Sequence, residues 1–131
     1  MNRHLLLCLL LLGVAFLPEP SAAAPRDGMP LVCGVNSLTA RERGRRETLV
    51  EDLMPEAQIE ETADGYQFTW TTDPQAYSKV VEFVGLERRC CPFLDFEMRV
   101  SGPNSPVVLV LHGDDETKQF VKDSGLLEGK P

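Results

Sequence analysis

The stretch AQIEETADGYQFTWTT, residues 57–72, decides the fold of this chain. Asp64-Gly65 is a turn signal, because these residue types tolerate the backbone angles of tight hairpin turns. Beyond the turn, aromatic side chains alternate with polar ones, at Tyr66, Phe68 and Trp70. A period of two places all three on one face of a strand. The stretch therefore predicts a β-hairpin with one buried face.

A second pair of extended runs follows in residues 94–112. The first run alternates apolar with charged side chains, and the turn-forming residues SGPNSP follow it. The run VVLVLH, residues 107–112, is apolar over five consecutive positions. A continuous apolar run is typical of a strand buried on both faces. We expect a second hairpin, with this run at the centre of the sheet.

Three helical segments alternate with the hairpins. Thr39 and Glu42 have the capping-box spacing, which predicts a first helix from this point as far as Pro55. Its expected inward positions are Leu49, Val50, Leu53 and Met54. Its four arginines at positions 41, 43, 45 and 46 alternate with glutamates and are interpreted as a solvated face.

The second helix is expected to begin at Asp73-Pro74, since proline is tolerated in a first turn. Its predicted inward stripe contains Tyr77, Val80, Val81 and Val84, widened by Phe83 and Leu86. A short third helix, with Phe120 and Val121 inward, ends the domain. The predicted fold class is α+β: a four-stranded antiparallel sheet with three helices packed on it, in the order α-ββ-α-ββ-α.

The amino terminus has the order of a secretory signal: a basic start, the apolar run at residues 5–17, and small residues up to Ala23. The run is shorter than the roughly 20 residues that span a membrane. We expect residues 1–23 to be a signal peptide, residues 24–36 an irregular lead-in and residues 37–131 a single domain. The predicted location is periplasmic or extracellular, with no membrane attachment after cleavage.

The chain is acidic, with a formal net charge of −7. This charge disfavours non-specific binding to nucleic acid or to anionic membranes. We therefore expect no nucleic-acid partner. The simplest interpretation of the net negative charge is that it keeps the protein soluble. The sequence leaves any protein partner undefined.

Three cysteines remain after the predicted cleavage: Cys33, Cys90 and Cys91. Cys90 and Cys91 lie in the motif ERRCCPF, where Pro92 disfavours helical geometry at Cys91 and stops the helix at the pair. An odd number of cysteines leaves at least one thiol unpaired within a monomer. Soft thiolates select thiophilic ions. The sequence thus predicts a three-cysteine site for Cu, Zn, Hg or As.

Two further pairs of residues complete this hypothesis. Zinc needs a fourth ligand, for which His112 and Asp95 are the candidates by chemistry. The side chains expected to offset the thiolate charge are Arg88 and Arg89.

Two alternatives stay open. A disulfide between Cys33 and one of the pair, in a secreted domain with a non-catalytic interaction role, closes a loop worth about 4 kcal/mol in the chain-entropy model. The other alternative is a thiol-redox protein. There is no Cys-x-x-Cys pair, and His112 is the one histidine beyond the predicted signal, so a non-catalytic role is favoured over an enzyme.

Cys33, the run DGYQFTW and the run FVGLERRCCPFLDFEMRV together resemble a family of short, largely uncharacterised bacterial proteins. That family carries one amino-terminal cysteine and a Glu-Arg-x-Cys-Cys-Pro-Phe motif. The resemblance covers roughly residues 33–126. It implies a shared small α+β fold and singles out Cys33, Cys90 and Cys91, but it implies no particular activity. The predicted export departs from the family, whose members mostly lack a signal.

Overall fold

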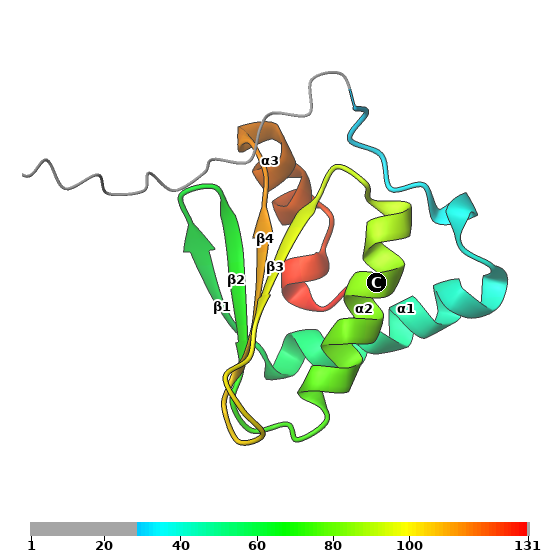
Figure 1. Cartoon of the computed structure of the whole chain (residues 1–131). Helices are drawn as coiled ribbons and strands as arrows, with labels where there is room; N and C mark the ends of the chain where they lie inside the picture. The colour runs from blue at the N-terminus through cyan, green and yellow to red at the C-terminus, as the bar shows by residue number, and fades with distance from the viewer. Residues whose placement is uncertain (1–28, 131) are drawn as a thin grey trace, which may run out of the picture.

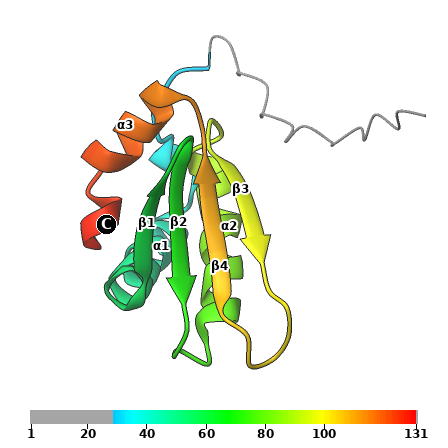
Figure 2. The same cartoon turned by 90° about the vertical axis from the view of Figure 1, so that its left-hand side faces the viewer.

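The structure, a computed structural model, describes residues 29–130. The predicted signal peptide and the first residues of the predicted lead-in lie outside the described residues. Two hairpins form one four-stranded antiparallel sheet with the strand order β1-β2-β4-β3 (Figure 2). The strands are β1 (Gln58–Thr62), β2 (Gly65–Trp70), β3 (Asp95–Arg99) and β4 (Val107–His112).

The predicted central position of VVLVLH is confirmed, because β4 pairs with β2 on one side and β3 on the other. Gly65 allows β2 and β4 to approach each other closely. A Cβ at this position would overlap the main-chain carbonyl of Leu111. A glycine is therefore required where the two hairpins meet.

Helices cover one face of the sheet, as predicted (Figure 1). In the described part of the chain, no helix lies against the opposite face, which looks toward the viewer in Figure 2. The helices are α1 (Ala40–Leu53), α2 (Ala76–Cys90) and α3 (Asp115–Asp123), with short 3-10 turns η1 (Val35–Ser37), η2 (Met54–Glu56) and η3 (Leu126–Glu128). The predicted α+β class and element order are confirmed.

The start of α1 follows the capping-box prediction. Thr39 Oγ1 accepts a hydrogen bond from the Glu42 amide at 3.2 Å, and the Glu42 carboxylate accepts one from the Thr39 amide at 2.8 Å. The predicted inward side chains Leu49, Val50 and Leu53 are all fully buried. They pack against the aromatic face of β2, where the Trp70 indole donates to the Leu53 carbonyl at 2.8 Å.

The predicted inward stripe of α2 is right in part. Val80, Phe83 and Leu86 are buried as predicted, whereas Tyr77 is 56% exposed and Val81 is 45% exposed. The full set of buried positions is Ala76, Val80, Phe83, Leu86, Glu87 and Cys90. The helix carries apolar side chains on two adjoining faces, and the packing of α1 and the sheet selects the face that also contains Glu87. A count of apolar residues cannot find that face, because it contains a carboxylate.

The arginines of α1 are also more than a solvated face. Arg45 makes a two-pronged contact with the Glu82 carboxylate of α2, at 2.8 and 2.7 Å. Arg46, whose side chain is only 18% exposed, contacts Glu87 in the same interface. The interleaved charges therefore bind α1 to α2 as well as solvating α1.

Within residues 29–130, no helix combines the length and the apolar character needed to cross a lipid bilayer.

Candidate functional site

The candidate site lies at the C-terminal end of α2. The helix ends at Cys90, and Cys91 leaves it with φ −120° and ψ 69°. This confirms the prediction that Pro92 stops the helix at the cysteine pair. The amide of Cys91 still donates to the Glu87 carbonyl at 2.7 Å. Cys91 is therefore turned out of the helical path while it stays attached to its last turn.

The lead-in segment caps this helix end. The Gly34 amide donates to the Cys90 carbonyl at 2.6 Å, and the Ser37 hydroxyl donates to the Arg89 carbonyl at 2.8 Å. The last carbonyls of a helix have no partner within the helix, so these two bonds satisfy acceptors that are otherwise unpaired. They also hold Cys33, which precedes Gly34, beside the end of α2.

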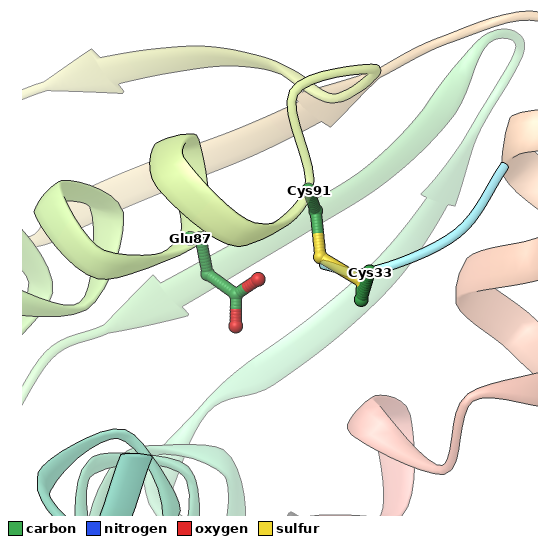
Figure 3. A group of neighbouring side chains, drawn as sticks. All are labelled: Cys33, Glu87 and Cys91. Carbon is green, nitrogen blue, oxygen red and sulfur yellow. A yellow bond between two sulfur atoms is a disulfide. The ribbon is translucent and has the colours of Figure 1, made fainter. Parts of the chain in front are cut away.

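Cys33 and Cys91 form a disulfide, with Cα atoms 4.6 Å apart and 58 positions apart in sequence (Figure 3). Cys91 is 1% exposed, and Cys33 is partly buried. This is the pairing that the disulfide alternative required. A disulfide is also compatible with an oxidising compartment.

Cys90 is the cysteine of residues 29–130 that stays a free thiol, and it is fully buried. Its Sγ lies 3.7 Å from the Cys91 Sγ and donates to the Glu87 carboxylate at 3.5 Å. The structure thus brings all three predicted cysteines to one place. In the state described, two of them are bonded to each other.

Glu87 is the site residue that our sequence analysis missed. It is 2% exposed, and its carboxylate receives a hydrogen bond from the Arg46 Nε at 2.6 Å. In Figure 3 the carboxylate lies on the same side of α2 as the disulfide. The signal was present in the motif, because Glu87 precedes Cys90 by three positions and Cys91 by four. Side chains at these spacings share a helix face.

Burial sets the protonation of the thiol and the carboxylate. Loss of solvation raises the pKa of Glu87, and the Arg46 guanidinium opposes this rise. Loss of solvation and the Glu87 charge raise the pKa of Cys90 to about 11, again against the effect of Arg46. Cys90 is therefore a thiol at neutral pH, and its reactive thiolate form is scarce.

The proposed fourth zinc ligands do not reach this site. His112 and Asp95 are paired across β4 and β3, on the sheet face that the described helices leave open. The His112 ring contacts Asp64 at 3.0 Å and Glu97 at 3.1 Å. A side chain on this face cannot share an ion with sulfurs on the other side of the sheet.

The guanidinium that lowers the pKa of Cys90 is Arg46 of the neighbouring helix, which the cysteine motif does not contain. Arg88 is exposed. Arg89 forms an ion pair with Glu42 at 2.6 Å, near the start of α1, and also interacts electrostatically with Cys90. Positive charge near the cysteines therefore comes from both α1 and α2.

The ligand atoms of the site are close together. The sulfurs of Cys33 and Cys91 and one Glu87 carboxylate oxygen all lie within 4.8 Å of one another. In the oxidised state the group is a disulfide beside a thiol and a carboxylate. Reduction of the disulfide leaves three thiols and a carboxylate, a donor set that suits a soft ion.

A separate hollow of about 550 Å³ lies at the other end of α2, where Tyr77 and Trp70 line it together with the β3–β4 loop. With 15 residues in α2, the two ends of the helix are roughly 20 Å apart. The residues that line this hollow include no cysteine or histidine. It therefore takes no part in the chemistry of the cysteine site.

Comparisons of the chain with models of protein families, with curated proteins and with solved structures found no match. Fold and site together define a small α+β domain with a disulfide and a buried thiol at a helix end. The resemblance to a bacterial family with a Cys-Cys-Pro-Phe core stays a prediction.

Proposed function

We propose that the reduced form of this protein captures a thiophilic metal or metalloid ion through Cys33, Cys90 and Cys91. The observation that supports the proposal is the convergence of three sulfurs from two distant segments at one helix end. Cys33 and Cys91 are within bonding distance, and Cys90 is 3.7 Å from Cys91. In this proposal the disulfide is the closed state of the site, and a thiol reductant opens it.

The burial of the site favours one of the candidate ions. An ion held by three thiolates leaves a net charge of −1 for Zn(II) or Hg(II) and −2 for Cu(I). Arsenous acid reacts with three thiols to give a neutral As(III) trithiolate and three waters. A buried site disfavours net charge, and Glu87 and Arg46 already neutralise each other. As(III) is therefore the ion that we expect to bind best.

The same reaction suits the protonation of the thiols. Cys90 keeps its proton at neutral pH because its pKa is raised to about 11. Capture of Zn(II) must release that proton and place a thiolate charge in the site. Capture of arsenous acid removes the proton as water, so no charge remains. The raised pKa thus weakens Zn(II) binding more than As(III) binding.

Native mass spectrometry of the full-length chain tests the proposal. The protein is prepared in a Cys8→Ser background, reduced with a phosphine and freed of reductant without oxygen. It is then mixed separately with arsenite, Zn(II), Hg(II) or Cu(I). We expect one arsenic per chain with the loss of three protons. The unreduced protein should bind none.

Single variants assign the ligands. Cys33→Ser, Cys90→Ser and Cys91→Ser should each weaken arsenite binding by at least about tenfold, a loss of about 1.4 kcal/mol or more. His112→Gln is the matched control and should bind like the parent, since His112 is on the other face of the sheet. Undiminished binding in the variant with all three cysteines replaced by serine would end the proposal.

A second candidate is a purely structural role for the disulfide in a secreted interaction domain. It is favoured by the way the Cys33–Cys91 bond and the Gly34 hydrogen bond tie the lead-in to α2. This role requires no reduced state. A reduced, folded chain that binds none of the four ions would select it.

A further inference from the structure

The oxidised site contains a thiol beside a proton acceptor and a disulfide, and no metal is needed for them to react. We propose that Cys90 exchanges with the Cys33–Cys91 disulfide inside the folded protein, forming a Cys90–Cys91 bond and releasing the Cys33 thiol, with Glu87 as the proton acceptor. This inference does not depend on ion binding, because it concerns the disulfide-bonded chain alone.

The contacts around Cys90 support each part of the step. Its Sγ lies 3.7 Å from the Cys91 Sγ, so the nucleophile and the sulfur that it attacks are in van der Waals contact. The thiol hydrogen is donated to the Glu87 carboxylate at 3.5 Å. Because Cys90 is fully buried, this carboxylate takes the place of solvent as the proton acceptor.

The step is balanced without an added oxidant or reductant. The Cys90 proton moves to the Glu87 carboxylate, and the thiolate forms a bond to the Cys91 Sγ. The bond between Cys91 and Cys33 breaks, and its electron pair leaves on the Cys33 sulfur. That sulfur then takes the proton from Glu87, whose carboxylate oxygen lies within 4.8 Å of it in the disulfide-bonded state, and the Glu87 carboxylate is restored. One disulfide and one thiol are present before and after the exchange.

The original disulfide should remain the major form. Adjacent Cα atoms are about 3.8 Å apart, which is below the usual disulfide range of about 4.4–6.8 Å. The Cα atoms of Cys33 and Cys91 are 4.6 Å apart, within that range. The Cys90–Cys91 form is therefore a strained minor species, and strained disulfides are the more reactive ones.

The exchange changes which thiol reaches solvent. Cys90 is buried in the core, whereas Cys33 is partly exposed on the lead-in segment. Release of Cys33 would leave that segment held at its hydrogen bonds from Gly34 and Ser37. The exposed Cys33 thiol can then react with a soluble disulfide or a soft electrophile. The exchange therefore replaces a buried thiol with one that solvent can reach.

Alkylation with peptide mapping tests the exchange. The full-length chain is prepared in a Cys8→Ser background, so that Cys90 is the remaining thiol of the oxidised protein. It is incubated natively with iodoacetamide and a chelator, quenched in acid and digested with pepsin at low pH, which prevents scrambling. We expect the label on Cys33 together with a Cys90–Cys91 bond. Label on Cys90 or on Cys91, or no label, overturns the proposal.

A variant without the nucleophile provides the control. In Cys90→Ala the disulfide has no thiol beside it, and we expect no label on Cys33. Circular dichroism and thermal unfolding show whether the variant keeps its fold, and Cys90→Ser replaces it if it does not. Label on Cys33 in either folded variant also overturns the proposal.

The role of Glu87 is tested by the pH profile of labelling. Transfer of the proton to the Glu87 carboxylate, 3.5 Å from the thiol, does not involve solvent, so the parent rate should be flat from about pH 7 to 9. Other charges at this helix end are Arg46 of α1 and Arg89 of α2. In Glu87→Gln the proton must go to solvent, and the rate should rise about tenfold per pH unit.

Reagent concentrations are chosen at which labelling no longer depends on the reagent, so that the exchange itself is measured. The exposed residue Glu47 provides the matched substitution, since Glu47→Gln should keep the flat profile. Equal slopes in the parent and in Glu87→Gln would remove Glu87 from the mechanism. Failure of ion binding would leave these labelling results unchanged, so the two proposals are separable.

Discussion

Two clusters of this molecule pair a carboxylate with a basic side chain, and the pKa of the carboxylate shifts in opposite directions in the two. Glu87 meets Arg46 at 2.6 Å between α1 and α2, where its side chain is 2% exposed. Asp64 meets His112 at 3.0 Å on the open face of the sheet, where its side chain is 58% exposed. The pKa of Glu87 is raised mainly by burial, whereas the pKa of Asp64 is lowered mainly by its hydrogen bond to His112.

The difference shows that solvation of a carboxylate affects its pKa more than the distance to its nitrogen partner does. The shorter contact belongs to the carboxylate whose charge is disfavoured, because loss of water costs more than one guanidinium returns. On the open face, water solvates both partners, and the contact adds a small favourable amount. In the described part of the chain, the free thiol of Cys90 and the Cys33–Cys91 disulfide lie beside the first cluster.

Removal of one partner should have its largest effect in the buried cluster. Arg46→Met leaves the Glu87 charge unpaired, and we expect a loss of about 3–5 kcal/mol in the free energy of unfolding. Urea unfolding of the oxidised protein measures it. Arg45→Met is the matched control on the same helix and should change little, because its pair with Glu82 is exposed.

The double variant Arg46→Met with Glu87→Leu sharpens this prediction. It removes both charges, so it should recover most of the stability lost in Arg46→Met. If Arg46→Met alone unfolds like the parent protein, burial does not separate the two clusters.

Removal of the disulfide beside the buried cluster should cause the second largest loss in the free energy of unfolding. Its 58-residue separation corresponds to about 4 kcal/mol in the chain-entropy model, and measured losses are typically about 2–4 kcal/mol. The variant Cys33→Ala with Cys91→Ala removes the bond and leaves Cys90 with no cysteine to form a disulfide with. Urea unfolding should show that loss, while Cys90→Ala, which keeps the bond, serves as the control. An equal loss in both would point to packing rather than to the crosslink.

The buried thiol should make stability depend on alkaline pH. Folding raises the pKa of Cys90 from 9.0 to about 11, so the folded state holds the proton more tightly. Its contribution is fully present below pH 9 and is lost as pH rises to about 11. Two pKa units correspond to about 3 kcal/mol.

Urea unfolding at pH 8–11 checks this prediction, with Cys90→Ser as the control and with the Cys33–Cys91 bond verified by acid peptide mapping. The parent should lose more stability than the control over this range. Parallel curves would show that burial leaves the thiol unperturbed.

The exposed cluster should give the smallest effect. His112→Gln removes the ring that contacts Asp64 and Glu97, and the expected loss is below about 1 kcal/mol. The lowered pKa of Asp64 means that its contribution is present at neutral pH and is lost as pH falls through the folded-state value. Thermal unfolding at neutral and acidic pH checks both points. A loss as large as that of Arg46→Met would contradict the comparison.

Much of the fold could be predicted from local patterns. The hairpin near Asp64, the capping box at Thr39 and the continuous apolar run of β4 each act over a few residues, and the structure contains all three. The turn of the hairpin lies one residue earlier than predicted, at Ala63 and Asp64, because Gly65 already pairs with Thr62 as the first residue of β2. The stop of α2 at the cysteine pair follows from Pro92 alone. These features depend on backbone geometry and strand period, which the sequence encodes directly.

The inward face of α2 and the site residue Glu87 could not be predicted in the same way. The face of α2 that contains Tyr77 and Val81 has as apolar a composition as the face that is buried. The choice between them depends on the position of α1, whose Arg46 makes burial of Glu87 tolerable. A polar residue on a buried face becomes predictable only when its partner is known.

By itself, the sequence determined the elements, their order and the placement of two cysteines at a helix end, because these follow from interactions between residues close in the chain. Only the tertiary structure decided which sulfur Cys33 bonds, which guanidinium faces the thiol and which carboxylate accepts its hydrogen. Those contacts join residues that are far apart in sequence, with the exception of Glu87, and even Glu87 is buried because of its distant partner Arg46. Long-range packing sets the solvation of each group, and solvation sets its charge.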